Sequence, residues 1–369
     1  MKFARNYAAA ALLALAAAGA TAQIMIGQTA GITGSVAVSV NETIAGAQLV
    51  IDAVNAQGGI NGEQIEMVRM DDAFDVQRAG ENARVLIEDK KVLALFISRG
   101  TPHTQAIIPW LDKHGVPLIA PSTGAMVLHK PLQKHIYNVR STYQREAQKA
   151  IAHLHTVGIE RIAVVHASDS FGKDGLEGAT AGFAAANLKP VAVLPADREK
   201  ADYAALVPAL VKSNAQAVLW IGSGTVVVEG IKALRAAGSV AQVVTLSNNA
   251  SGGFIKQLGT ASSGVIVTQV FPNERSAGTP MVKEAMTLAK AKGQAELSPA
   301  ALEGFAAGKV LVEALRRAGP KPTRAKLLAA LDGLRNYDLG GLEVSYSPLD
   351  HTGIDFADLS IISEGKFKR

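Results

Sequence analysis

Residues 94–128, with the sequence ALFISRGTPHTQAIIPWLDKHGVPLIAPSTGAMVL, decide the fold. The apolar run 93–97 is short and continuous, which is typical of a strand buried on both faces. A polar segment follows, and Pro102 suits the first turn of a helix with Thr101 as its N-cap. A second apolar run, 116–120, ends in another polar segment. The order strand, loop, helix, strand, loop predicts a parallel sheet of an α/β protein.

The two polar segments, Ser98 to Thr101 and Pro121 to Gly124, carry the first functional hypothesis. Parallel strands end at the same edge of a sheet, and open α/β sheets bind ligands at that edge. Hydroxyl groups, backbone N–H groups at a helix start and the guanidinium of Arg99 suit a carboxylate or another anion. Three alternatives remain open: the hydroxyls only cap helices, Arg99 points to solvent, and His103 is a solvated residue at a helix start.

Strand and helix patterns alternate along the whole chain and start again after Arg140. Ser39 and Glu42 are spaced as a capping box for the first helix. The length of 369 residues is comfortable for two domains. We therefore predict an α/β fold with two doubly wound, Rossmann-like lobes joined by a hinge. The predicted boundaries are residues 23–141 plus 272–350 for the N-terminal lobe and 142–271 plus 351–369 for the C-terminal lobe.

The first 22 residues have the pattern of a secretory signal peptide. Lys2 and Arg5 precede an apolar run over 7–18, and Ala20-Thr21-Ala22 forms a small-residue cleavage site. The run is too short to span a bilayer, although an N-terminal membrane anchor is the alternative. Removing the segment near Ala22 reduces the formal net charge from +5 to +3. The chain has no cysteine, so it has neither a disulfide nor the attachment residue of a lipoprotein. These features predict a periplasmic protein that is not embedded in the membrane.

Most enzymatic and nucleic-acid-binding signatures are absent from the sequence. There is no P-loop, G-x-G-x-x-G, G-x-S-x-G or H-E-x-x-H motif, and basic patches interleaved with aromatic residues are missing. His153 and His155 are two residues apart on a predicted helix and so do not share a face. Asp71 and Asp72 are adjacent on a strand and point to opposite faces. We predict no enzymatic activity, no cofactor, no metal and no nucleic-acid partner.

The chain resembles the type I periplasmic substrate-binding proteins of ABC transporters, in the branched-chain amino acid (Leu/Ile/Val) receptor group. The segments that carry the resemblance span nearly the whole mature chain in the order of the family. They include IGQTAGITG, AGAQLVIDAVNAQGGINGEQIEMV, ISRGTPHTQA, GVPLIAPSTGA, YNVRSTYQREA, ERIAVVHASDSFGKDGLEG, IKALRAAG and DLGGLEVSYSP. The resemblance implies two Rossmann-like lobes joined by three crossovers, which close around a ligand.

The resemblance also implies roles for particular residues. Thr101 matches the hydroxyl residue that takes the ligand carboxylate, and Phe171, in the loop after the strand 161–166, matches an aromatic contact. Ser223 and Ser247 fall where amino-acid receptors have a tyrosine and an acidic residue. The complete set of predicted ligand-binding residues is Arg99, Gly100, Thr101, Ser122, Thr123, Gly124, Tyr143, Phe171, Ser223, Ser247 and Asn248.

The replacement of the acidic residue by Ser247 bears on the ligand. A buried ammonium without an anionic partner is costly, and Asp169 could serve as that partner only if the geometry allows. We therefore expect a carboxylate without an ammonium group, either an aromatic or a short aliphatic acid. The predicted function is a monomeric solute receptor that delivers its ligand to an inner-membrane ABC permease. The alternatives are a sensor component with the same fold, a receptor for branched-chain amino acids proper, and a secreted enzyme.

Overall fold

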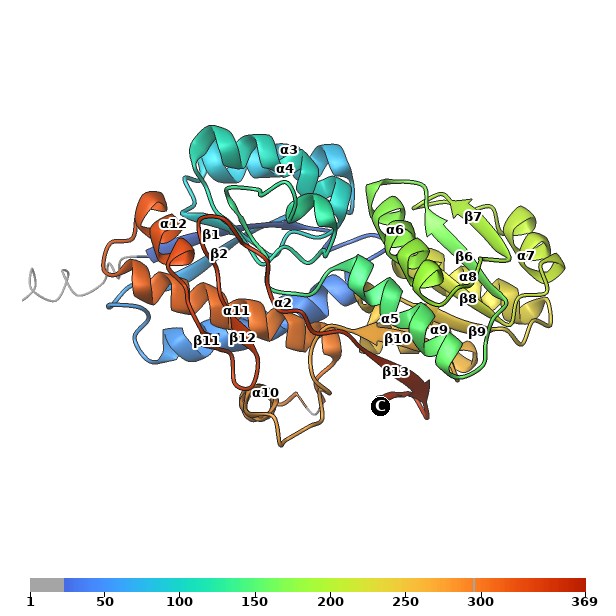
Figure 1. Ribbon diagram of the computed structural model, residues 1–369. Coiled ribbons are helices and arrows are strands. Elements are labelled where there is room, and N and C mark those ends of the chain that lie inside the picture. The colour runs from blue at the N-terminus through green and yellow to red at the C-terminus, as the bar shows by residue number, and fades with distance from the viewer. Residues whose placement is uncertain (1–22, 295) are drawn as a thin grey trace, which may run out of the picture.

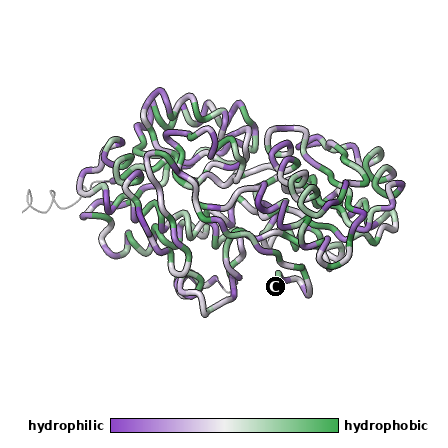
Figure 2. Tube along the Cα trace, in the orientation of Figure 1, coloured by the Kyte–Doolittle hydropathy of each residue, from purple (hydrophilic) through white to green (hydrophobic). Residues whose placement is uncertain are grey.

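The computed structural model describes residues 23–294 and 296–369, so the predicted signal peptide lies outside the described residues. Two lobes lie side by side, each with a central sheet covered by helices on both faces (Figure 1). Apolar and polar residues alternate along the helices of both lobes (Figure 2), as expected when one face of each helix packs on a sheet. The predicted α/β class and the two doubly wound lobes are confirmed.

The first lobe contains a parallel five-stranded sheet in the order β2-β1-β3-β4-β5. Its strands are β1 (Gln23–Ala30), β2 (Gln64–Asp71), β3 (Ala94–Phe96), β4 (Leu118–Ile119) and β5 (Ile136–Tyr137). Its helices are α2 (Ala37–Ala56), α3 (Val76–Arg84) continued by η2 (Val85–Asp89), α4 (Thr101–His114), η3 (Met126–Leu128), α10 (Pro280–Ala291), α11 (Pro299–Ala318) and α12 (Arg324–Asp332). A small hairpin of β11 (Tyr337–Asp338) and β12 (Glu343–Val344) follows.

The second lobe contains a seven-stranded sheet in the order β14-β13-β10-β9-β8-β6-β7. Its strands are β6 (Ile162–Ala167), β7 (Ala192–Ala196), β8 (Ala217–Ile221), β9 (Gln242–Thr245), β10 (Ile266–Gln269), β13 (Asp358–Ser363) and β14 (Lys366–Lys368). Its helices are α5 (Tyr143–Thr156), α6 (Ser170–Ala185), α7 (Tyr203–Lys212), α8 (Gly224–Ala236), η4 (Ser247–Asn249), α9 (Gly252–Leu258) and η5 (Gly259–Ser262). In the described part of this sheet, β13 runs antiparallel to both of its neighbours, β10 and β14, and the other strand pairs are parallel.

The chain passes between the lobes three times. It crosses after β5, returns after β10, and crosses again between β12 and β13 (Figure 1). These three connections form the predicted hinge. The exact lobe boundaries along the chain stay predictions.

Helices α2 and α11 pack on one face of the first sheet with almost no space between their backbones. A Cβ atom added at Gly46 would lie 1.8 Å from the carbonyl oxygen of Ala301, and one added at Gly304 would lie 1.8 Å from that of Thr43. Such an approach requires glycine on both helices. The pair places the N-terminal half of α11, with Glu303, next to the ligand edge of the sheet predicted above.

The lobes also touch outside the three connections. The Glu42 carboxylate on α2 accepts hydrogen bonds from the backbone N–H groups of Gly252 (3.0 Å) and Gly253 (2.8 Å) at the start of α9. The predicted capping box is therefore wrong: α2 begins at Ala37, and Ser39 Oγ donates to the carbonyl of Val36. Glu42 caps a helix of the other lobe instead of its own.

Candidate functional site

The two polar segments of the opening stretch lie side by side, as the strand order predicted. Arg99 and Ser122 form an isolated parallel β-bridge, and Ser122 N–H donates to the carbonyl of Ser98 at 2.7 Å. The hydroxyls of Thr101 and Thr123 are buried and 2.8 Å apart. A pair of facing hydroxyls with rotatable protons can turn either a donor or an acceptor toward a ligand.

Thr101 is the first residue of α4 and not its N-cap, which corrects the prediction. The N-cap is Gly100, with φ of 91°, and no side chain caps this helix end. A Cβ at Gly100 would lie 2.7 Å from His103 Nδ1 and 3.0 Å from the ring of Phe74. Glycine is needed here for its positive φ and for the close approach of these two rings. The Thr101 hydroxyl does not cap the helix and is consequently free to form a hydrogen bond with the Thr123 hydroxyl.

The guanidinium of Arg99 is buried and bound within the protein. It donates to Ser122 Oγ (2.9 Å), to Ser39 Oγ (3.3 Å) and across the lobes to the carbonyl of Asn248 (2.6 Å). The alternative that Arg99 points to solvent is therefore wrong. Burial lowers the pKa of Arg99, but a guanidinium stays charged because its ordinary pKa is so high.

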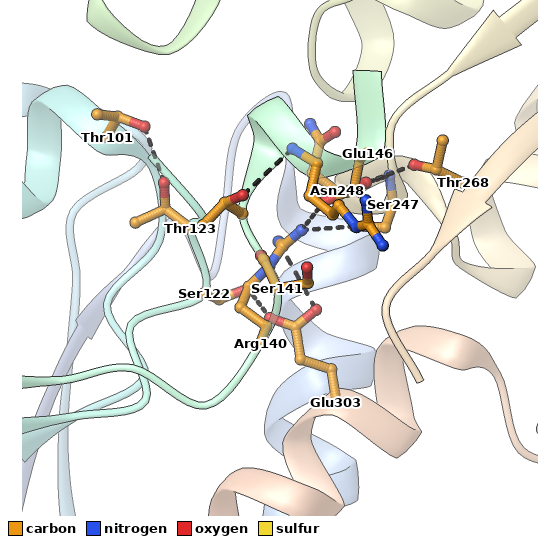
Figure 3. A network of polar contacts seen from close by, with 12 residues as sticks. Thr101, Ser122, Thr123, Arg140, Ser141, Glu146, Ser247, Asn248, Thr268 and Glu303 are labelled. Carbon is orange, nitrogen blue, oxygen red and sulfur yellow. Dashed lines mark hydrogen bonds and ion pairs between the residues drawn. The ribbon is translucent and has the colours of Figure 1, made fainter. Parts of the chain in front are cut away.

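A buried network of charges surrounds Arg140, which lies on the first connection between the lobes (Figure 3). Arg140 pairs with Glu146 of α5 and donates to Ser247 Oγ, and its Nη1 lies 3.9 Å from Glu303 of α11. Glu303 also accepts the Ser122 hydroxyl proton at 2.6 Å. The network thus joins one helix from each lobe to the hinge.

Ser247 belongs to this network. Its N–H donates to Glu146 Oε2 at 2.8 Å, and the Thr268 hydroxyl donates to the same oxygen. Gly124 and Tyr143 pack against the same connection: the carbonyl of Gly124 accepts from the Tyr143 N–H at 2.8 Å. Several predicted ligand residues therefore also hold the hinge in place.

Aromatic and cationic side chains stack across the interface between the lobes. His103 stacks on Phe74 with ring centroids 4.3 Å apart. The Arg198 guanidinium carbon lies 4.9 Å from the Phe74 centroid and 5.6 Å from that of Phe171, and Tyr143 meets the edge of Phe171 at 4.8 Å. We call His103, Phe74, Arg198, Phe171 and Tyr143 the interlobe stack.

Two members of the interlobe stack have buried polar atoms without partners among the described residues. They are both ring nitrogens of His103 and Nη2 of Arg198. Burial lowers the pKa of His103 to about 4, so its imidazole is neutral near pH 7. Because His103 is almost fully buried, the alternative of a solvated histidine is wrong.

Both carboxylate oxygens of Asp169 already have partners within the protein. One carboxylate oxygen accepts from the N–H of Gly172 as the N-cap of α6, and the other pairs with Arg198. Helix α6 begins at Ser170, so Phe171 lies in its first turn. The prediction that Phe171 lies in the preceding loop is therefore wrong.

The remaining predicted residues lie at the strand ends of the second sheet. Ser223 is the N-cap position of α8, and its Oγ accepts a hydrogen bond from Asn248 Nδ2 at 2.8 Å. A small cavity of about 10 Å³ lies beside these groups. Its lining includes Ser223, Gly222, Phe171, Trp220 and Arg198.

Sequence reasoning missed Phe74, Arg198, Glu146 and Glu303. Phe74 and Arg198 follow β2 and β7 at the same sheet edges as the predicted residues. The rule that ligands bind at these edges, applied to every strand, would have found them. The two glutamates lie on helices, and nothing in their local pattern signals a buried network.

Within residues 23–294 and 296–369, no three histidine, aspartate or glutamate side chains are grouped as metal ligands would be. No helix in the same residues is long and apolar enough to cross a membrane.

The model of the family described as "Periplasmic binding protein" matches residues 23–359. The chain belongs to this family. The chain is 26% identical over 343 residues to Leu/Ile/Val-binding protein homolog 3 of Brucella melitensis, covering 90% of this chain and 89% of that one. An amino acid binding protein of Pseudomonas aeruginosa is 28% identical over 210 residues, and the match spans about half the length of each chain, 55% and 54%.

Among solved structures, a substrate-binding periplasmic protein from Ralstonia solanacearum superposes with a TM-score of 0.86 at 32% identity. The match covers 92% of this chain and 98% of that one. The predicted resemblance to type I receptors of the Leu/Ile/Val group is confirmed, and this periplasmic binding protein is a small-ligand receptor by family.

Proposed function

We propose that this periplasmic binding protein is the non-enzymatic receptor of an ABC importer, and that its ligand is a carboxylate without an ammonium group. The ligand lies between the lobes, with its carboxylate on the hydroxyls of Thr101 and Thr123 and the N–H groups at the start of α4. Closure of the lobes around the ligand then presents the closed form to a membrane permease.

The observation that carries this proposal is that the carboxylates around the proposed site already have partners within the protein. Asp169 is paired with Arg198, while Glu146 and Glu303 adjoin Arg140. Ser247, which the family resemblance matches to the acidic residue of amino-acid receptors, bonds to Arg140 and Glu146. An ammonium group would find no uncommitted carboxylate among these residues, and burying it unpaired is costly.

A ligand reaches this site only when the structure moves. The cavity beside Arg198 and Ser223 holds no more than a water molecule. Rotation of the lobes about the three connections opens the site, and re-formation of the interlobe stack closes it. This sequence of events is the hinge closure used by two-lobed binding proteins.

Matched pairs of compounds test the proposal. Each pair has one carbon skeleton with and without the ammonium group: leucine and 4-methylpentanoate, valine and 3-methylbutanoate, phenylalanine and 3-phenylpropanoate. We expect the acids to raise the melting temperature and to bind in calorimetry, and the amino acids to have no effect. Stronger stabilisation by leucine or valine would make the protein a branched-chain amino acid receptor, as the names of its relatives suggest.

The Thr101→Val variant tests the placement of the carboxylate. Valine keeps the shape of threonine but removes the hydroxyl, and we expect the affinity for the bound acid to fall about tenfold. Thr180→Val is the matched control, because the Thr180 hydroxyl is exposed and donates only to Leu176 of its own helix. Equal affinities of the two variants would contradict the proposed position.

A further inference from the structure

Arg198 reaches across the interface from the loop that follows β7. Its guanidinium lies against Phe74 of the first lobe and Phe171 of the second, at 4.9 and 5.6 Å from the ring centroids. A planar guanidinium forms hydrogen bonds only in its own plane, because all of its N–H bonds lie in that plane. The partners of Arg198 are therefore restricted in direction.

The in-plane donors of Arg198 are only partly used. Nε pairs with the Asp169 carboxylate, while Nη2 is buried and has no partner among the described residues. A buried donor without a partner is unfavourable, and native structures rarely keep one. Arg198 Nη2 therefore needs a hydrogen-bond acceptor that the described residues do not supply.

Ser223 offers a second donor next to the same cavity. Its Oγ already accepts from Asn248, so the hydroxyl proton is available for donation. Arg198 and Ser223 both line the cavity with Phe171, Gly222 and Trp220. The cavity is thus bounded by two donors and two aromatic rings.

We propose that the end of the ligand remote from its carboxylate presents a neutral oxygen acceptor, a carbonyl or a hydroxyl, to Arg198 and Ser223. This inference rests on the proposed function and specifies its substrate class as oxygen-substituted carboxylic acids. An alkyl end, as in the side chains of leucine and valine, leaves Arg198 Nη2 unpaired when the lobes close.

Charge balance favours a neutral acceptor over a second carboxylate. Asp169 already neutralises Arg198, and the charges of Arg99 and Arg140 are balanced by Glu303 and Glu146. The first carboxylate of the ligand already adds one negative charge that no free cation balances, so burying a second anionic group would be more costly still.

Two sets of three acids test the inference by calorimetry. Each set keeps the carbon skeleton up to the far end and changes the groups there: 4-methylpentanoate, 4-oxopentanoate and butanedioate, then 4-methylbenzoate, 4-hydroxybenzoate and benzene-1,4-dicarboxylate. In at least one set we expect the neutral oxygen compound to bind about 10- to 100-fold more tightly than the methyl compound. Tighter binding of the methyl compound or the dicarboxylate in both sets would overturn the inference.

The Arg198→Met variant assigns the preference to its residue. Methionine keeps an unbranched apolar chain next to the rings but removes every donor of Arg198. The preference for the oxygen compound over the methyl compound of the same set should therefore fall to the smaller part that Ser223 contributes. Lys200→Met, an exposed residue of the same loop, is the control and should keep the preference. Ser223→Ala should reduce the preference without abolishing it, which keeps the test informative if the methionine variant is unstable.

The outcomes separate this inference from the proposed function. Binding of the acids without a preference for oxygen refutes the inference alone. Binding of leucine, valine or phenylalanine in place of all six acids refutes the proposed function, and the inference with it. An unchanged preference in Arg198→Met refutes the role of Arg198.

Discussion

The buried charges around Arg140 lead to the most demanding prediction. Arg140 and Glu146 are 2% and 0% exposed, and they pair directly. Substitution Arg140→Met leaves the Glu146 carboxylate buried with only the Ser247 N–H and the Thr268 hydroxyl as donors. Removing one partner of a buried ion pair typically costs about 3–5 kcal/mol of unfolding free energy. We expect a loss in this range.

A double-mutant cycle measures the pair itself. Urea denaturation, followed by circular dichroism, gives the unfolding free energies of Arg140→Met, Glu146→Gln and the double variant. Because the double variant removes both charges, its loss should be smaller than the sum of the single losses by about 0.5–3 kcal/mol. Arg145→Met is the control, since the Arg145 side chain is 54% exposed and its pairing with Asp355 is at the surface.

Two results would refute the reasoning. The first is a loss in Arg140→Met no greater than that in Arg145→Met, which would mean that the burial of Glu146 carries no penalty. The second is strict additivity of the two single variants, which would mean that Arg140 and Glu146 do not interact.

Two further predictions concern the first lobe. Burial raises the pKa of the Asp72 carboxyl from 3.8 to about 6, so the folded state binds a proton at Asp72 more tightly than the unfolded state does. The contribution of Asp72 to the free energy of unfolding therefore falls as the pH rises from about 4 to about 7. Asp72→Asn should therefore stabilise the protein by about 1–3 kcal/mol at pH 7.5 and flatten the pH dependence of the urea midpoint, and an unchanged slope would contradict the shift. Gly304→Ala should lower the melting temperature strongly, because the new methyl would lie 1.8 Å from the Thr43 carbonyl oxygen. Gly278→Ala is the control and should leave the melting temperature unchanged, since a Cβ there has no atom within 4 Å. Equal melting temperatures of the two variants would refute the close packing.

The sequence pattern predicted the parts of the site that follow from strand order. The loops of Thr101 and Ser122 had to meet, because two consecutive parallel strands end at one edge of a sheet. The pattern also identified the two lobes, since each repeats the same alternation. These conclusions need only periodicity and the rule for parallel strands.

Contacts between the lobes could not be predicted in the same way. Glu42 was interpreted as part of a capping box three residues after Ser39, but it caps α9 more than two hundred residues away. Local spacing cannot distinguish these partners, because both satisfy free N–H groups at a helix start. The position of Arg198 after β7 could have been found from the sheet-edge rule, but its contacts with Phe74 and Phe171 could not be predicted from local spacing.

The burial of the charges around the hinge determines how the receptor responds to dissolved salt. Arg99, Arg140 and Glu146 are almost fully covered by protein, so mobile ions cannot approach them. Dissolved salt weakens attraction between exposed charges but has much less effect on enclosed ones. The stability that these charges give to the closed form should consequently remain nearly constant from dilute to concentrated salt. Such tolerance suits a member of the periplasmic binding protein family if the ionic strength around it changes.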